Sequence, residues 1–391
     1  NLERIEKSYT NNLAFDKTDL AGDFDGDGRL DFVANNQVFT KLFEANTGNT
    51  PINLPVGNGQ LFSGTTLTNN KLNQFHSFIY AKETANTIEF KTYNLISNTV
   101  LLNNTKVINF NNAITRDYSL DHPDCSGSII SNQIKVNTYL EGDYNGDGIS
   151  EVVIESFKNP RAWFEGYTYY DIDGIPFTDC YETATNDGTD FHIINIDPNA
   201  NTTLGQKDFA LIPNGNLLEG GKKFVMDFNS DGKSDVLIIN YDKTYRIVSF
   251  KQLTAAPWIT LEVIGSGTLD KYSATKQILF GDYNGDGKTD IMLPDTEGGE
   301  GHVTWHIYFG NPKSLGGEFF TKETYSITEY RPTTGSAYKT QIHYSNYYAM
   351  DINKDGKSDL VRVWRKYYKD DWSINDHNTQ WQVTGFTNNI G

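Results

Sequence analysis

The sequence lacks several features that would narrow its function at once. Its 391 residues include only two cysteines and three methionines, and no stretch approaches the roughly 20 apolar residues of a transmembrane helix. Basic side chains are outnumbered, with 33 Lys and Arg against 50 Asp and Glu and a net charge of −17. Nucleic acids and anionic membranes bind basic surfaces, so this charge argues against both as partners and against insertion into a membrane.

Familiar catalytic motifs are also missing. The chain has no GxSxG, HExxH, GxxxxGK[ST] or GxGxxG segment. The two cysteines, Cys125 and Cys180, fit neither a CxxC pair nor a zinc site. Two alternatives stay open for them: one disulfide, which suits an exported protein, or two free buried thiols.

What the chain has instead is β-forming sequence. Tyr (23) and Phe (23) are abundant, and Thr, Val and Ile recur in short runs without a helical period. These features predict an all-β fold. A length of 391 residues allows one large β domain, and we expect residues 1–391 to form it.

One acidic motif recurs five times. Its first aspartates are separated by 120, 84, 55 and 69 residues, and an apolar run stands before and after each copy. We therefore expect each copy to be a loop between two adjacent strands, in a repeat of about 55–70 residues. A unit without the motif is expected at 72–125, and an insertion at about 156–222. The five copies are GDFDGDGRLDFV from Gly22, GDYNGDGISEVVI from Gly142, MDFNSDGKSDVLII from Met226, GDYNGDGKTDIML from Gly281 and MDINKDGKSDLVRV from Met350.

The spacing within the motif predicts a calcium site in each loop. Side-chain oxygens stand at positions 1, 3, 5 and 9, glycine at position 6 permits a sharp turn, and the carbonyl of position 7 is expected to complete the ligands. An EF-hand is excluded because position 12 is never Glu and the flanks are strands. The expected ligands of about five Ca²⁺ ions are, loop by loop, Asp23, Asp25, Asp27, Arg29 and Asp31; Asp143, Asn145, Asp147, Ile149 and Glu151; Asp227, Asn229, Asp231, Lys233 and Asp235; Asp282, Asn284, Asp286, Lys288 and Asp290; and Asp351, Asn353, Asp355, Lys357 and Asp359.

The distribution of charge favours ions over the alternative, which is five turns shaped only by side-chain hydrogen bonds. The motifs hold 16 of the 50 acidic side chains, and the remaining 34 nearly equal the 33 basic ones. Turn formation alone explains neither the crowding of carboxylates nor the acid at position 9.

These residues carry a resemblance from about Asp23 to Val363. The motif and its flanks resemble the FG-GAP/VCBS repeats of integrin α-chain-like β-propellers. The resemblance implies antiparallel blades with calcium loops on one rim, seven blades being favoured and six possible. Glu151 departs from the usual Asp of the family, which puts the second site in doubt. The stretches DINKDGKSDLVRVW and NTQWQVTGF are also similar to bacterial RHS and insecticidal-toxin-complex B proteins.

Aromatic clusters outside the repeat are the candidate binding residues. We single out Trp163, Tyr167 and Tyr170 in the insertion and Trp372 near the end, because exposed aromatics suit protein or sugar recognition. Packing between blades is the competing interpretation for Trp163 and Trp372.

Together these features predict a calcium-stabilised binding or structural module without enzymatic activity. We expect it to be extracellular or on the cell surface, to recognise a protein or glycan, and to be part of a larger bacterial polypeptide. A carbohydrate-binding lectin is one alternative. A polysaccharide lyase or hydrolase is another, because the many carboxylates do not single out a catalytic pair.

Overall fold

The structure is a computed structural model, and strands dominate it. Apart from the 3-10 turn η1 (Gly215–Leu218), every described element is a β-strand, which confirms the all-β prediction. No helix among the described residues is long and apolar enough to cross a membrane. The structure describes residues 3–9, 19–28, 31–40, 50–55, 57, 59–68, 71–73, 75–84, 86–110, 114–128, 136–196, 209–253, 259–294, 301–311, 318–331, 335–336, 339–351, 355–370 and 380–387.

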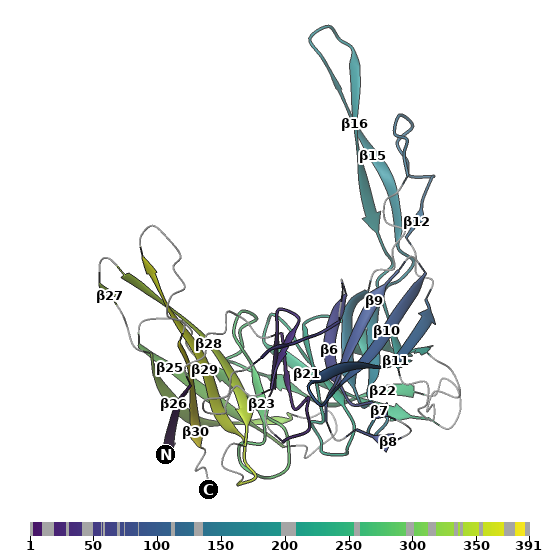
Figure 1. Cartoon of the computed structure of the whole chain (residues 1–391). Coiled ribbons are helices and arrows are strands. Elements are labelled where there is room, and N and C mark those ends of the chain that lie inside the picture. The colour runs from purple at the N-terminus through teal and green to yellow at the C-terminus, as the bar shows by residue number, and fades with distance from the viewer. Residues whose placement is uncertain are drawn as a thin grey trace.

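Six antiparallel sheets of four or five strands make up the body of the protein (Figure 1). Three of them lie in the first part of the chain. In order across each sheet, their strands are β2 (Leu20–Gly22), β3 (Asp31–Ala34), β4 (Gln37–Phe39) and β5 (Ile52–Asn53); β6 (Gln60–Gly64), β9 (Ser77–Glu83), β10 (Thr87–Ile96) and β11 (Thr99–Asn109); and β13 (Val136–Gly142), β14 (Glu151–Phe157), β17 (Thr189–Asn195) and β18 (Phe209–Leu211).

The other three sheets follow in chain order. The last of them takes its fifth strand from the start of the chain, because β1 pairs antiparallel with β30 from Glu3↔Thr387 to Tyr9↔Trp381. The strands are β19 (Lys222–Met226), β20 (Asp235–Ile239), β21 (Thr244–Gln252) and β22 (Ile259–Thr268); β23 (Leu279–Gly281), β24 (Asp290–Pro294), β25 (Gly301–Gly310) and β26 (Phe320–Arg331); and β27 (Gly335–Ser336), β28 (Lys339–Met350), β29 (Asp359–Asp370), β30 (Gln380–Thr387) and β1 (Glu3–Tyr9).

Neighbouring sheets pack face to face, so a central strand buries both of its faces. In β20, Val236 and Ile238 contact the core that includes Leu140 and Phe191 of the preceding sheet. The alternate residues of β20, among them Leu237, enter the core shared with the following sheet. Burial on both sides explains why the second strand of each motif-bearing unit is a continuous apolar run.

The sheets contact one another in a cyclic order. Apolar cores join the β2–β5 sheet to the β6–β11 sheet, and each later sheet to the next as far as the last. The rings of Phe32 and Tyr348, 5.1 Å apart, then join the last sheet to the first. The sequence interval expected to hold one unit without the motif, 72–125, contains most of the β6–β11 sheet. The propeller architecture itself stays a prediction.

A two-stranded arm projects from this body (Figure 1). It is formed by β15 (Arg161–Tyr170) and β16 (Pro176–Thr185), which pair antiparallel along their whole length. The short strand β12 (Thr115–Arg116) runs parallel to the base of β15. The hairpin lies within the expected insertion, 156–222, whereas β17 and β18 in the same range belong to the body. A small ribbon of β7 (Leu67–Thr68) and β8 (Lys71–Leu72) completes the described strands.

Candidate functional site

Each of the five acidic motifs joins two strands that are consecutive in the chain and paired in one sheet: β2 and β3, β13 and β14, β19 and β20, β23 and β24, and β28 and β29. The residue before position 1 pairs with the acid at position 9, as in Gly142↔Glu151 and Gly281↔Asp290. The five loops therefore occupy equivalent places in five of the six sheets, as the flanking apolar runs predict. Two expected ligands, Arg29 and Asn353, lie outside the described residues.

The carboxylate at position 1 organises the curl of the loop. In the first loop, Asp23 Oδ1 accepts from the N–H of Gly26 at 2.7 Å and Asp23 Oδ2 from that of Gly28 at 2.9 Å. The fourth loop repeats these bonds, with Asp282 accepting from Gly285 and Gly287. The glycine at position 6 has φ between 77° and 84° in all five loops, a conformation that disfavours other residues.

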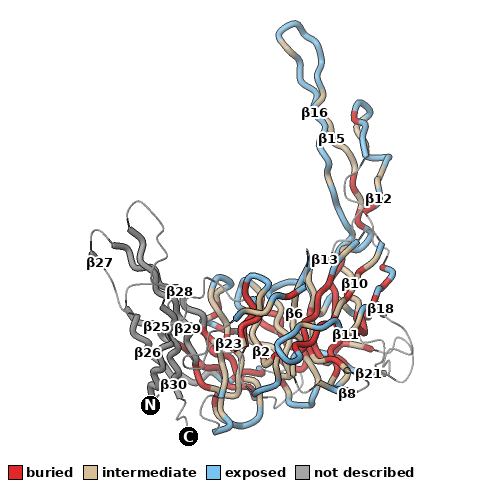
Figure 2. Tube along the Cα trace, in the orientation of Figure 1, coloured by how far each residue is buried: buried red, intermediate tan, exposed pale blue. Residues whose placement is uncertain are grey.

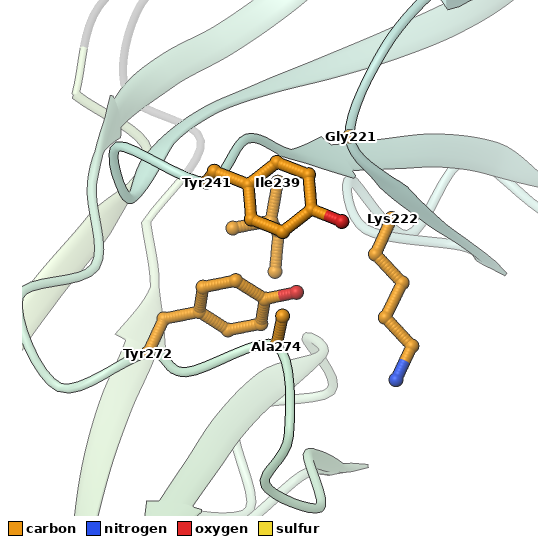
Figure 3. A pocket seen from close by; sticks show the side chains of 6 residues that line it. All are labelled: Gly221, Lys222, Ile239, Tyr241, Tyr272 and Ala274. Carbon is orange, nitrogen blue, oxygen red and sulfur yellow. The ribbon is translucent and has the colours of Figure 1, made fainter.

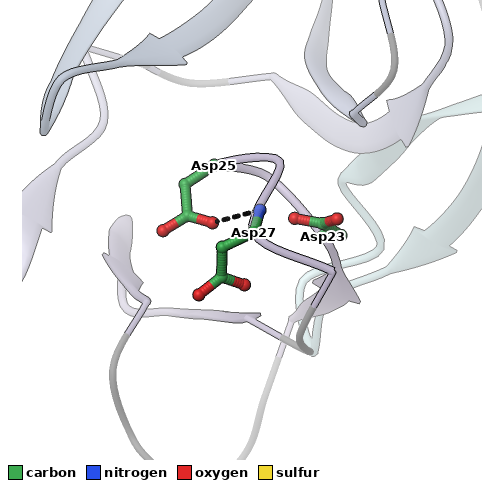
Figure 4. A group of neighbouring side chains, drawn as sticks. All are labelled: Asp23, Asp25 and Asp27. Carbon is green, nitrogen blue, oxygen red and sulfur yellow. Dashed lines mark hydrogen bonds between the residues drawn. The ribbon is translucent and has the colours of Figure 1, made fainter.

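The curl brings acidic side chains together. In the first loop, one carboxylate oxygen each from Asp23, Asp25 and Asp27 lie within 4.8 Å of one another (Figure 4). The N–H of Asp27 also donates to Asp25 Oδ1, at 3.1 Å. In the other four loops an asparagine stands at position 3, and the N–H of position 5 donates to its side-chain oxygen in three of them, as from Asp286 to Asn284 at 2.9 Å.

The acid at position 9 is the first residue of the second strand and is fully buried in every loop. One of its oxygens accepts from the N–H of position 2, as in the 2.8 Å bond from Phe24 to Asp31 Oδ2. The second oxygen of Asp31, and likewise that of Asp235, is buried without a hydrogen-bond partner. A buried carboxylate oxygen without a partner is costly, and a bound cation would satisfy it. The residues present therefore fit a hard cation.

Burial shifts the titration of these acids. Loss of hydration raises the pKa of Asp31, Asp235 and Asp290 from 3.8 to about 7. It raises the pKa of Glu151 from 4.5 to about 9. The other carboxylates of each loop add to the shift, so a cation placed among them would reverse its sign.

The second loop differs from the others. Its position-9 acid is Glu151, whose two oxygens accept from the N–H of Tyr144 and from the side-chain amide of Asn145. Asp290 of the fourth loop also has a partner at each oxygen, the N–H of Tyr283 and that of Gly310, whereas one oxygen of Asp31 and one of Asp235 have none. In the second loop, one of the two partners is the side-chain amide at position 3.

The residue at position 8 forms hydrogen bonds with position 1 of the preceding loop, a role that the sequence interpretation missed. The N–H of Ser234 donates to the carbonyl of Asp143 at 2.6 Å, and the N–H of Asp143 donates to Ser234 Oγ at 2.9 Å. Ser358 and Asp282 repeat both bonds, and the Thr289 hydroxyl donates to the Asp227 carbonyl at 2.7 Å. We call this pairing of position 8 with the preceding position 1 the latch.

The latch also explains why the residue before position 1 of the second loop is a glycine. A Cβ at Gly142 would lie 2.7 Å from Ser234 Oγ and Val225 Cγ1, closer than atoms pack. The signal in the sequence was the recurrent Ser or Thr at position 8, but only the sheet order shows which loop it contacts. Each latch connects a predicted ligand of one loop to the residue between two predicted ligands of the next.

We expect loss of a latch hydroxyl to destabilise the body. Ser234→Ala leaves the partly buried N–H of Asp143 without its acceptor, which should lower the free energy of unfolding by about 1–3 kcal/mol. Urea unfolding in calcium measures the change. Ser234→Thr, which keeps a hydroxyl, should lose less. Ser273→Ala, whose hydroxyl lies 3.1 Å from that of Thr275 in an exposed turn, is the control and should be near neutral. Equal stability of Ser234→Ala and the control would contradict the role of the latch.

The predicted binding aromatics of the insertion all lie on the arm. Tyr167 and Tyr170 are 67% and 70% exposed, whereas Trp163 is half-buried nearer the base. Figure 2 shows β16 as largely exposed, whereas β15 is exposed only in its outer half. The fourth predicted residue, Trp372, lies outside the described residues. Tyr169 and Phe177 belong to the same aromatic cluster of the sequence but were not selected as binding residues, and Tyr181 was overlooked; all three are exposed.

The two cysteines are joined in a disulfide. Cys125 lies in the segment 114–128 beside the arm, Cys180 lies in β16, and 55 residues separate them in the chain. The structure thus selects the first of the two alternatives that the sequence left open. The bond attaches the arm to the segment that runs along it.

A small pocket of about 230 Å³ opens elsewhere, at one edge of the β19–β22 sheet (Figure 3). The rings of Tyr241 and Tyr272 line it, with the side chain of Lys222 beside them. Tyr241 is 91% exposed and Tyr272 is buried. None of the residues predicted from the sequence as binding residues contributes to this pocket.

A comparison with known protein families gives a match in the part of the chain that holds the third and fourth loops. Residues 227–293 match the FG-GAP-like repeat. The matched segment begins at position 1 of the third loop and ends in β24, just beyond the fourth loop. The match supports assignment to an FG-GAP repeat family, and it covers the two loops whose latch joins Thr289 to Asp227. A search of the curated proteins finds no match.

Proposed function

We propose that the chain is a six-bladed β-propeller of FG-GAP repeats. The cyclic order of the six sheets supports this, as does the pairing of β1 with β30, by which the start of the chain completes the last sheet. Four-stranded antiparallel blades are the unit of such propellers. Five blades carry the acidic motif and the β6–β11 sheet does not. The count is therefore six, the alternative to the seven that the family resemblance favours.

The proposal includes calcium in the five loops. The side-chain oxygens at positions 1, 3, 5 and 9 would hold it, with the carbonyl at position 7. The support is the convergence of Asp23, Asp25 and Asp27 and the unpartnered buried oxygens of Asp31 and Asp235. A bound ion would offset the crowded negative charge and crosslink two strands of a blade. Through the latches it would also stiffen the contact between blades.

The function we propose is recognition, without catalysis, by an exported bacterial protein. The observation that carries it is the arm: a disulfide-linked hairpin that projects from the body and carries exposed aromatic side chains. A disulfide suits an oxidising compartment, which favours an extracellular or cell-surface location. The narrower proposal, that the propeller belongs to an RHS or toxin-complex B type of protein, rests on the sequence resemblance alone.

Counting bound ions tests the metal part of this function. Native mass spectrometry of the chain in calcium should show about five ions, with the second loop the last to fill because of Glu151. Asp286→Asn should remove one ion, whereas Glu262→Gln, on an exposed strand position of the body, should remove none. Spectra without bound calcium, or with the same number in Asp286→Asn, would contradict the assignment.

A further inference from the structure

One face of the arm carries most of its aromatic side chains, and the pairing register of β15 with β16 defines this face. Residues paired across two antiparallel strands share a face, and successive residues alternate between faces. The pairs Trp163↔Thr183, Glu165↔Tyr181, Tyr167↔Asp179 and Tyr169↔Phe177 therefore lie on the same side. We call the side formed by Trp163, Tyr167, Tyr169, Phe177 and Tyr181 the aromatic face.

In the half of the arm nearer the body, the opposite face is covered by the protein itself, whereas Tyr170 farther out on that face is 70% exposed. Cys180 on that face is bonded to Cys125, and Phe164 contacts the guanidinium of Arg116, 4.9 Å from its ring centroid. Arg116 also pairs with Asp121 at 2.8 Å, and Asp121 Oδ1 accepts from the N–H of Phe164 at 2.9 Å. The segment 114–128 thus braces one face of the arm.

The bracing leaves the aromatic face exposed and ordered at the same time. Tyr167 is 67% exposed, and Tyr169 and Phe177 stack with their ring centroids 5.8 Å apart. Glu165 accepts from both the Trp163 indole and the Tyr181 hydroxyl, which fixes those two rings in place. A preorganised surface loses little side-chain freedom on binding, so large exposed rings held this way suit an interface.

The charge of the arm indicates the chemistry of its partner. The sequence has no Lys or Arg from Ala162 to Gln206, whereas Glu165, Asp171, Asp173 and Asp179 all lie on the arm. The two arginines at its base are engaged within the protein, Arg116 with Asp121 and Arg161 with Asp117 and Asp187. The outer arm therefore combines aromatic rings with uncompensated negative charge.

We propose that the aromatic face binds a basic segment of another protein. This inference rests on the proposed recognition function and names its partner class. Arg or Lys side chains of the partner would stack on the tyrosine rings and pair with Glu165 and Asp179. Strand β16 is the last strand of its described sheet, so its outer edge offers backbone groups to an extended polypeptide. A projecting two-stranded ribbon suits a peptide better than a small ligand, which binds in concave pockets.

Binding of defined peptides to the full chain tests the proposal. The probe is an immobilised peptide of alternating arginine and valine, with a glutamate–valine peptide of equal length as its control, measured by biolayer interferometry in saturating calcium. The arginine peptide should bind and the glutamate peptide should not. Tyr167→Ala combined with Tyr169→Ala should weaken binding at least about tenfold. Asp179→Asn should weaken it less and reduce its dependence on salt.

Matched variants separate the aromatic face from general attraction. Tyr170→Ala removes an equally exposed tyrosine from the opposite face and should change binding by less than about twofold. Glu262→Gln with Glu318→Gln removes two exposed carboxylates of the body and should also have little effect. Equal binding by the wild type and the Tyr167/Tyr169 double variant would overturn the proposal, since attraction would then be unspecific.

A glycan array run in parallel distinguishes the other class of partner. Glycan binding that the double variant abolishes, without binding of the arginine peptide, would overturn the basic-partner proposal and leave the arm as a recognition surface. Glycan binding lost only in Tyr241→Ala would place recognition in the pocket of Figure 3 and overturn it as well. Failure of the proposed recognition function is separate, because then neither the peptides nor any glycan would bind, and failure of its calcium part would show as melting that is independent of calcium.

Discussion

Removal of divalent cations is expected to lower the midpoint of thermal unfolding by at least about 10 °C, and added calcium should restore it. The reason is the number of sites acting on one folded unit. A ligand at a hundredfold its Kd stabilises a protein by about 2.7 kcal/mol per site when the unfolded chain does not bind it. Five such sites together are comparable with the ~5–15 kcal/mol stability of a typical domain.

The loops explain why the loss should be large rather than local. Without an ion, the first loop keeps three carboxylates close to one another, and every loop keeps a position-9 acid buried. Each latch connects one loop to the neighbouring sheet, as from Asp143 to Ser234. We therefore expect one cooperative transition at a lower temperature, measured by calorimetry or circular dichroism, rather than the separate melting of single sheets.

Two controls make this prediction specific. Magnesium at the same concentration should restore little, because it prefers rigid octahedral coordination and retains its water. Asp286→Asn should melt below the wild type in calcium. In chelator the difference should shrink, because the substitution then removes repulsion among the carboxylates together with an ion pair to Lys288, whose Nζ lies 2.7 Å from Asp286 Oδ2. Identical melting of the wild type in chelator and in calcium would show that calcium does not stabilise the fold.

The local parts of the fold were predictable from the sequence, because they depend on residues close together in the chain. Glycine at position 6 and the acid at position 9, just before an apolar run, predict a curled loop between two strands. The structure has such a loop at each of the five motifs, as between Gly281 and Asp290. The continuous apolar run after the motif follows from the burial of both faces of that strand.

Features that depend on distant contacts were not predictable in the same way. Serine is a common turn residue, so the sequence does not mark Ser234 as a contact residue. Its hydrogen bond with Asp143 forms only because two sheets are adjacent. Similarly, the aromatic residues of the insertion form a visible cluster in the sequence, yet their division between two faces depends on the pairing register. Tyr167 and Tyr170 were grouped as binding residues, but the register places them on opposite faces.

The pH dependence of stability is expected to change sign with calcium. In the metal-free protein, the pKa of Asp31, Asp235 and Asp290 is about 7 and that of Glu151 about 9, above their unfolded values near 4. Between these limits the folded state holds more protons than the unfolded state. The free energy of unfolding of the metal-free protein should therefore fall as pH rises, by up to about 1.4 kcal/mol per pH unit for each group.

With calcium bound, the same carboxylates must be ionised, and a proton competes with the ion. Stability in calcium should therefore rise with pH through the same window. Melting midpoints from about pH 5.5 to about pH 8, in metal-stripped buffer and in calcium, measure both slopes. Below this window the slope of the metal-free protein should change sign and match that in calcium, because hydrogen bonds lower the pKa of other acids such as Asp121 and Asp242, whose protonation destabilises the fold.

Substitution of one buried acid tests the cause of this reversal. Asp235→Asn removes a titrating group, so the metal-free variant should lose part of the downward slope and be more stable than the wild type near pH 8. The same variant should be less stable than the wild type in calcium, because an amide oxygen replaces a charged ligand. Asp242→Asn, whose carboxylate is exposed and bonded to Thr244, should leave the sign of both slopes unchanged. Parallel slopes with and without calcium would mean that the buried acids at position 9 are not metal ligands, and the body would then owe its stability to sheet packing and latches alone.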